Sequence, residues 1–195
     1  MAATITLQHG ECNECGEYSE YRHLMDLLKW QEKRKEIGVP LTAKLLLSVG
    51  ELSVRKNHKV VVEALQELPL DYSDYWYVIV GRGPLHDELL AADHTGRLKL
   101  LGYRTDIVEL LRASDLFVFP SLQEGLPVAL MEAMACGVPC IASKIRGNVD
   151  LLDDDSTVIN NNWVEKIQTA CRNRILSREY RKENIENKMK MIYKG

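Results

Sequence analysis

The sequence lacks the features that would place it in a membrane or on nucleic acid. No apolar run approaches the roughly 20 residues that a membrane-spanning helix needs. The N-terminus, MAATITLQHG, has neither the basic start nor the apolar middle of a secretory signal. The 25 Lys and Arg residues are outnumbered by 28 Asp and Glu, so the chain has no excess positive charge to attract nucleic acid or an anionic membrane. We therefore expect a cytoplasmic protein without a nucleic-acid partner and with at most peripheral membrane contact.

The cysteines lack the spacing of a disulfide framework or a zinc site. Their number, five, is odd, which favours a reducing compartment. Cys12 and Cys15 form a lone CxxC between polar and acidic flanks, and no second pair follows at zinc-ligand spacing. Cys136 and Cys140 lie in an apolar segment and Cys171 in a predicted helix. We interpret the CxxC pair as loop cysteines and expect neither a metal nor a cofactor.

The composition, 46% hydrophobic and 27% charged, is typical of a globular domain. We divide the chain into three segments. Residues 1–32 show no clear period, are expected to pack poorly and have no role that we can assign. Residues 33–160 carry a regular alternation of apolar segments, and residues 161–195 are predicted to form C-terminal helices.

Short apolar runs alternate with amphipathic stretches in the middle segment. This alternation predicts an α/β fold, a Rossmann-like doubly wound parallel sheet. The predicted strands are 44–49, 75–80, 98–101, 116–119 and 139–142, with a further short strand at 157–159, and the predicted helices are 57–68, 85–92, 107–113 and 126–136.

Glycines and polar residues follow several of the predicted strands, where such a sheet binds its ligands. Glycines also make tight turns, which explains some of them but not the accompanying arginines and serine. The positions are Gly50, Gly81-Arg82-Gly83, Gly102-Tyr103-Arg104 and Pro120-Ser121.

The stretch EGLPVALMEAMACG, from Glu124 to Gly137, has the strongest chemical pattern. Pro127 suits a first helical turn, and every residue from 128 to 136 is apolar except Glu132. A helix that is apolar all round is expected to be buried, where a lone carboxylate needs a partner. The helix N-terminus between the two acids could hold a diphosphate, while the acids accept hydrogen bonds from ribose and sugar hydroxyls. Alternatively, Glu124 only favours the helix dipole and Glu132 points to solvent.

Five blocks of the chain resemble a known family. SLQEGLPVALMEAMACGVPCIAS is similar to the E-x7-E signature of the GT-B retaining glycosyltransferases of family 4, also called glycosyl transferases group 1. The segments LLLSVGELSVRKNHKVVVEAL, VIVGRGPLHDELL, LKLLGYRTDIVELLRASDLFVFPS and SKIRGNVDLL resemble the family's other blocks in the same order. The resemblance covers about residues 33–152 and implies the donor-binding, C-terminal half of a GT-B fold.

The resemblance also implies roles for individual residues. Glu124 would bind donor-sugar hydroxyls as a catalytic residue, and Glu132 would hold the ribose. The backbone at Gly125, Leu126 and Val128 would line the sugar and the diphosphate.

Lys56 would be the second catalytic residue, stabilising the charge that develops on the diphosphate, although it could instead be a solvated lysine in a charged loop. Tyr103 and Arg104 would hold the base. Gly81 and Gly83 would let the backbone approach the donor. Where many members of the family have Arg, this chain has Glu51, for which Arg55 could compensate as a further substrate-binding residue, although Arg55 is also interpreted as an ordinary loop residue.

The implied activity is transfer of a hexose from a UDP- or GDP-sugar, with retention and without a metal, in cell-surface polysaccharide or glycoconjugate synthesis. An acceptor-binding domain is missing, and residues 1–32 are too few to replace it, so the chain alone is expected to be inactive. The alternative is a non-catalytic nucleotide-sugar-binding module that pairs with another protein. A dehydrogenase is disfavoured because His86 stands where a dinucleotide-binding motif has its third glycine.

Overall fold

Six parallel strands form a single sheet in the order β3-β2-β1-β4-β5-β6. The structure is a computed structural model that describes residues 17–68, 74–159 and 162–171. The predicted parallel sheet is confirmed, and the predicted strand bounds agree with the observed ones to within a residue. The strands are β1 (Lys44–Val49), β2 (Tyr75–Val80), β3 (Leu98–Leu100), β4 (Leu116–Phe119), β5 (Cys140–Ser143) and β6 (Thr157–Val158).

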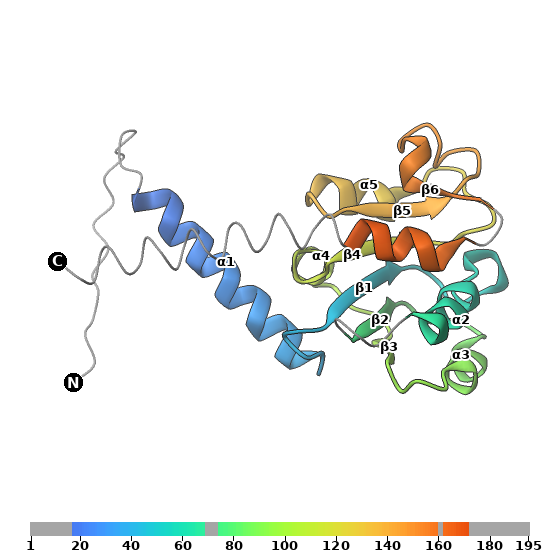
Figure 1. The fold of residues 1–195 in the computed structure, drawn as a ribbon, viewed down its shortest axis with the longest axis horizontal. Coiled ribbons are helices and arrows are strands. Elements are labelled where there is room, and N and C mark those ends of the chain that lie inside the picture. The colour runs from blue at the N-terminus through green and yellow to red at the C-terminus, as the bar shows by residue number, and fades with distance from the viewer. Residues whose placement is uncertain (1–16, 69–73, 160–161, 172–195) are drawn as a thin grey trace.

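Helices cover both faces of the sheet (Figure 1). Two short 3₁₀ turns, η1 (Val54–Lys56) and η2 (Asp154–Ser156), follow β1 and precede β6. Residues 163–171 are also helical. The α-helices are α1 (Glu17–Glu36), α2 (Lys59–Glu67), α3 (His86–Ala92), α4 (Ile107–Ala113) and α5 (Val128–Ala135).

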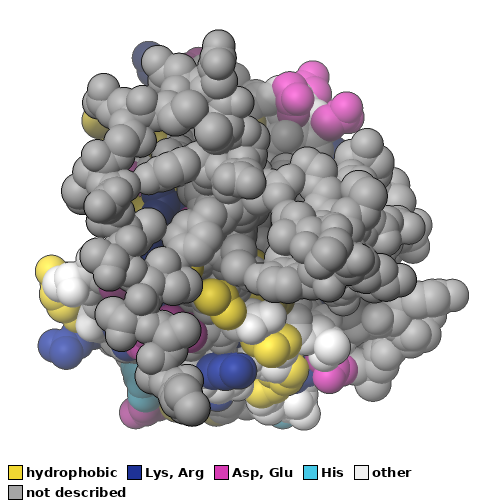
Figure 2. Space-filling view, turned by 90° about the vertical axis from the view of Figure 1, so that its left-hand side faces the viewer, with side chains coloured by type: hydrophobic (Ala, Val, Ile, Leu, Met, Phe, Trp, Pro, Cys, Tyr) yellow, Lys and Arg dark blue, Asp and Glu magenta, His cyan; other side chains and the backbone are white. Residues whose placement is uncertain are grey.

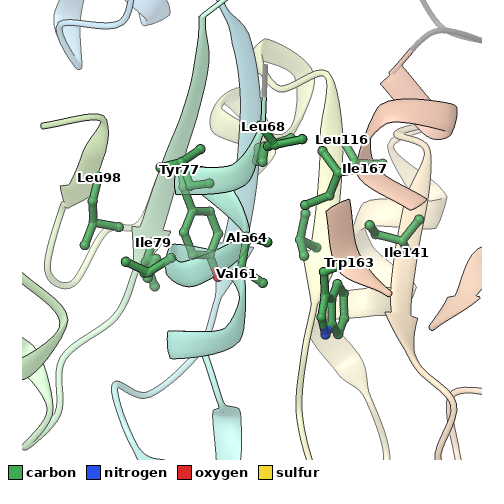
Figure 3. Packing of buried hydrophobic residues seen from close by; sticks show 14 of the residues in the cluster. Val61, Ala64, Leu68, Tyr77, Ile79, Leu98, Leu116, Ile141, Trp163 and Ile167 are labelled. Carbon is green, nitrogen blue, oxygen red and sulfur yellow. The ribbon is translucent and has the colours of Figure 1, made fainter. Parts of the chain in front are cut away.

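The sheet buries both faces because successive strand side chains point to opposite sides. Leu46 faces the cluster beneath α2, whereas Leu45 and Leu47 face the cluster beneath α4 and α5. Trp163 and Ile167 pack into the first cluster (Figure 3). The described part of the 161–195 segment therefore packs against one face of the sheet, on the same side as α2.

Helix α1 was not predicted from the sequence. It runs without a break across the boundary placed between residues 32 and 33. Its packing begins late, because Met25, Leu27 and Leu28 are exposed, whereas Trp30 is partly buried and Arg34 completely buried. On the side of the molecule from which α1 projects, described hydrophobic side chains lie beside basic ones (Figure 2). The CxxC pair, Cys12 and Cys15, lies outside the described residues.

A buried ion pair fixes the end of α1 to the sheet. The Arg34 Nη2 atom lies 2.5 Å from Asp115 Oδ2, and the two side chains are 1% and 5% exposed. The Arg34 guanidinium also donates to the carbonyl of Ala43 at 2.7 Å, and the backbone N–H of Leu45 donates to Asp115. These contacts lie at the amino ends of β1 and β4, opposite the edge of the sheet where parallel α/β folds bind ligands.

Candidate functional site

The strand order reverses between β1 and β4, the point at which a doubly wound sheet opens a crevice. The helix that follows β1 packs on one face of the sheet, and the helix that follows β4 packs on the other. The loops after the two strands meet there, since the backbone N–H of Leu122 donates to the carbonyl of Arg55 at 2.8 Å. The topology thus brings together two predicted parts of the site that lie far apart in the sequence.

Lys56 is held at this reversal point of the sheet by the turn that carries it. Asn57 ends η1 in the left-handed conformation, with a φ of 51°. The Lys56 side chain lies against the backbone of Gly50, where an added Cβ would be 3.3 Å from Lys56 Cε. Its Nζ is 4.9 Å from the centroid of the Phe119 ring, and the side chain is only 13% exposed. A surface lysine free in solvent, the alternative interpretation, does not describe this environment.

Glu124 closes the site from the other loop. Its Oε1 atom lies 2.6 Å from Lys56 Nζ, and its Oε2 atom lies 3.8 Å from Arg55 Nη1. The Glu124 side chain is 7% exposed. The structure therefore brings Lys56, Arg55 and Glu124, three of the predicted site residues, together, and Lys56 and Glu124 form an ion pair.

The segment between Glu124 and α5 packs against the loop after β5 on one side and exposes apolar side chains to solvent. Gly147, after β5, is so close that an added Cβ would lie 3.4 Å from the Gly125 carbonyl. The side chains of Leu126 and Val128 are 69% and 52% exposed. The helix predicted over residues 126–136 is present, but it is shorter, since α5 begins at Val128 and ends at Ala135.

Helix α5 is not buried all round, contrary to the prediction. Only Leu130 and Ala133 are buried, whereas Met131 and Met134 are 42% and 38% exposed and Glu132 is exposed. The sequence shows the apolar face of this helix but not whether a neighbouring element covers it. Glu124, rather than Glu132, is therefore the enclosed acid, and the ribose-binding role of Glu132 stays a prediction.

Gly81 and Gly83 serve the packing of two loops against each other. An added Cβ on Gly81, whose φ is 152°, would lie 1.8 Å from the Gly50 carbonyl oxygen. One on Gly83 would lie 2.4 Å from the carbonyl oxygen of Leu52. These glycines let the loop after β2 support the loop that carries Lys56; their predicted approach to the donor stays a prediction.

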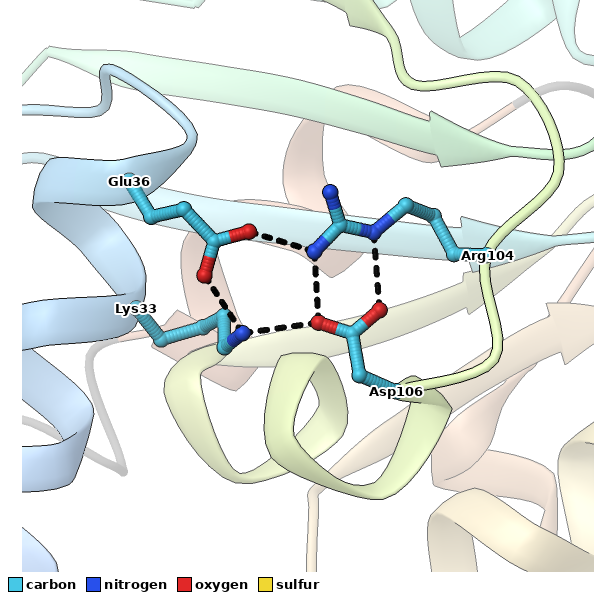
Figure 4. Close-up of polar contacts among 4 residues, drawn as sticks. All are labelled: Lys33, Glu36, Arg104 and Asp106. Atoms are coloured by element: carbon cyan, nitrogen blue, oxygen red, sulfur yellow. Dashed lines mark hydrogen bonds and ion pairs between the residues drawn. The ribbon is translucent and has the colours of Figure 1, made fainter.

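Tyr103 and Arg104, the predicted base-binding residues, differ in accessibility. Tyr103 is 71% exposed, whereas the Arg104 guanidinium pairs with Asp106 and Glu36. Lys33 contacts the same two carboxylates and completes a closed ring of four charges between α1 and the start of α4 (Figure 4). The ring holds the pKa of the Asp106 carboxyl well below its usual range, chiefly through the hydrogen bond from Arg104. Arg104 therefore anchors this loop to α1, a contact that sequence reasoning missed.

A buried polar chain behind the site was also missed. His58 Nδ1 lies 3.0 Å from Tyr77 Oη, which lies 2.8 Å from Ser48 Oγ. The Ser48 hydroxyl donates to the Val118 carbonyl. Burial lowers the pKa of His58 to about 4, and the charge of nearby Lys56 adds to this. A serine and a tyrosine inside two buried strands were the signal in the sequence that could have revealed this row of hydrogen-bonded side chains.

Residues 17–68, 74–159 and 162–171 contain no group of three or more His, Cys, Asp or Glu side chains arranged to hold a metal ion. Within the same ranges, no helix has both the length and the apolar composition needed to cross a membrane.

Comparison with known proteins places this site in a family. The family model described as glycosyl transferases group 1 matches residues 30–191. The chain is 35% identical over 170 residues to the UDP-Gal:alpha-D-GlcNAc-diphosphoundecaprenol alpha-1,3-galactosyltransferase of Escherichia coli. This match covers 74% of this chain and 44% of the relative. It is 37% identical over 120 residues to the amylovoran biosynthesis glycosyltransferase AmsK of Erwinia amylovora, covering 55% of this chain and 30% of that protein. The chain thus spans less than half the length of these relatives.

The fold also resembles that of a solved structure of a known protein. The crystal structure of Anabaena Alr3699/HepE in complex with UDP-glucose superposes with a TM-score of 0.65 at 22% identity, covering 78% of this chain and 44% of that one. The predicted resemblance and the predicted half of a GT-B fold are confirmed. On its sequence blocks, its sheet and these matches, the chain belongs to the glycosyl transferases group 1 family.

Proposed function

We propose that this chain is the donor-binding domain of a retaining hexosyltransferase that uses a UDP- or GDP-sugar in polysaccharide or glycoconjugate synthesis. The observation that carries the proposal is the enclosed Lys56–Glu124 pair at the reversal point of the sheet. Family membership and the names of the relatives support the reaction class.

The two side chains have the chemistry that a nucleotide sugar requires. The Lys56 ammonium can bind the diphosphate and stabilise the charge left on it when the sugar departs. The start of α5 adds the partial positive charge of a helix N-terminus. The Glu124 carboxylate can accept hydrogen bonds from sugar hydroxyls. With these groups in place the donor needs no metal, and transfer with retention would use the departing phosphate to accept the proton of the acceptor.

We further propose that a second domain or a separate protein supplies the acceptor site. Large apolar side chains remain exposed around the Lys56–Glu124 pair, as expected for a surface that another protein covers. These side chains are Val54 at 71%, Leu122 at 56%, Leu126 at 69% and Val128 at 52% exposure.

Calorimetry with UDP and GDP tests the donor site. Lys56→Gln should weaken binding of the preferred diphosphate about 10- to 100-fold, the loss expected for one hydrogen bond to a charged group. Binding of the matching nucleoside should not change, because it has no phosphate. The matched control is Lys59→Gln, which removes a half-exposed lysine three residues away that pairs with Glu88.

Two outcomes contradict the proposal. If the wild-type chain binds neither UDP nor GDP, it is not a donor-binding domain for these nucleotides. If Lys56→Gln weakens nucleoside and diphosphate equally, Lys56 has no phosphate role. If the wild-type chain does bind a nucleotide, sugar transfer after addition of an acceptor domain would distinguish an enzyme from the alternative, a non-catalytic binding module.

A further inference from the structure

We propose that Arg55 is a positioning residue that pairs with Glu124 when a bound diphosphate takes Lys56 away from it. The inference rests on the proposed function, because it concerns how the same site exchanges its internal ion pair for a ligand. Arg55 then acts on donor binding through Glu124 rather than through its own contact with phosphate.

The starting geometry already contains both partners of the exchange. Lys56 and Arg55 approach different oxygens of one carboxylate, at 2.6 Å and 3.8 Å. The first distance is a short charge-assisted hydrogen bond, and the second is just beyond hydrogen-bond range. The Arg55 side chain is 49% exposed, so it is free to adjust, whereas that of Lys56 is 13% exposed.

The backbone holds Arg55 beside Glu124. The Leu122 N–H donates to the Arg55 carbonyl at 2.8 Å, and Arg55 Nη1 approaches the Gln123 carbonyl at 3.4 Å. Arg55 therefore remains beside the Glu124 carboxylate whichever cation Glu124 binds. A planar guanidinium can also donate two parallel hydrogen bonds to a carboxylate, which an ammonium cannot do.

Burial makes the exchange necessary. The Glu124 side chain is 7% exposed, and a carboxylate left unpaired in such surroundings is strongly destabilised. When Lys56 turns to a diphosphate, the ligand brings further negative charge next to that carboxylate. Among the described residues, Arg55 is the one other cation within 4 Å of Glu124. Glu51, on the same loop, is exposed and cannot serve as the partner, because it carries the same sign of charge.

The test is a double-mutant cycle in the full chain, measured as the Kd for UDP or for GDP, whichever binds the wild type. Arg55→Gln should raise the Kd about tenfold, because Glu124 loses its replacement partner. In a Glu124→Gln background, the same change should alter the Kd by less than about twofold, because no charge remains to be paired. Arg55→Lys should restore part of the affinity, because an ammonium keeps the charge but cannot make the two parallel hydrogen bonds of a guanidinium.

The outcomes separate three mechanisms. If Arg55→Gln weakens binding equally in both backgrounds, Arg55 contacts the phosphate directly and the exchange is wrong. If it has no effect in the wild-type background, Arg55 has no role in binding. If the wild type binds neither nucleotide, the proposed function fails first and the exchange with it. Arg112→Gln, an exposed change of the same kind in the last turn of α4, is the matched control, and thermal unfolding confirms that each variant folds.

Discussion

Replacing Arg34 by methionine is expected to lower the free energy of unfolding by about 3–5 kcal/mol, because it leaves the buried Asp115 carboxylate without its charged partner. Methionine fills a similar volume, so the loss reflects charge and hydrogen bonding rather than a cavity. The carbonyls of Ala43 and Ala113 also lose the donors that the guanidinium supplies. Urea denaturation at neutral pH measures the change.

The matched control for this change is Lys35→Met, which removes an exposed cation from the next position of α1. We expect a difference of less than about 0.5 kcal/mol there. In the double variant Arg34→Met with Asp115→Asn, part of the stability should return because the buried side chain at position 115 no longer carries a charge. A loss for Arg34→Met no larger than that for Lys35→Met would show that the buried pair does not hold α1 to the sheet.

Stability should also fall by about 3 kcal/mol between pH 6.5 and pH 4, through His58 alone. Burial lowers the pKa of His58 from its ordinary 6.5 to about 4 in the folded protein. Folding therefore favours the neutral imidazole. This contribution is complete above pH 6.5 and is lost as the pH falls through the folded pKa, because the unfolded chain takes up the proton first.

The measurement is the urea unfolding free energy at several pH values, compared with that of His58→Gln. Glutamine is polar and does not titrate, so the variant should lack the His58 part of the slope in this window. Carboxylates such as Asp93, whose pKa is lowered in the folded state, act in both proteins and cancel in the comparison. Parallel curves for the two proteins would contradict a buried neutral His58.

The strands and helices of the sheet could be predicted because their patterns are local. Runs such as KLLLSV and YWYVIV consist mostly of apolar residues, as a strand buried on both faces requires, and they became β1 and β2 with the predicted bounds. Helix α1 escaped prediction because most of its described side chains, from Met25 onward, stay exposed. A solvent-facing helix of this kind has little periodic pattern to detect.

The candidate site residues could be proposed from the sequence, but their environments could not be predicted from it. Lys56 and Glu124 were chosen from separate motifs, and only the parallel order of β1 and β4 puts them in contact across 68 positions of sequence. The base-binding role of Arg104 stays a prediction, and its guanidinium lies in the ring with Glu36 and Asp106. Ion pairs between distant segments leave no periodic trace, so sequence reasoning had no means of finding the ring.

What the sequence by itself determined was the alternation of buried strands and helices and the half of a GT-B fold, and it supplied the acids and the lysine of the proposed nucleotide-sugar site. The tertiary structure decided which acid is enclosed: Glu124 lies between two loops, whereas Glu132 lies on an exposed helix. Apolar periodicity tells which faces seek burial, because that preference belongs to each residue and its immediate neighbours. Whether a given side chain is covered, and by which charge it is paired, depends on elements far away in the chain, which only the packed fold brings into contact.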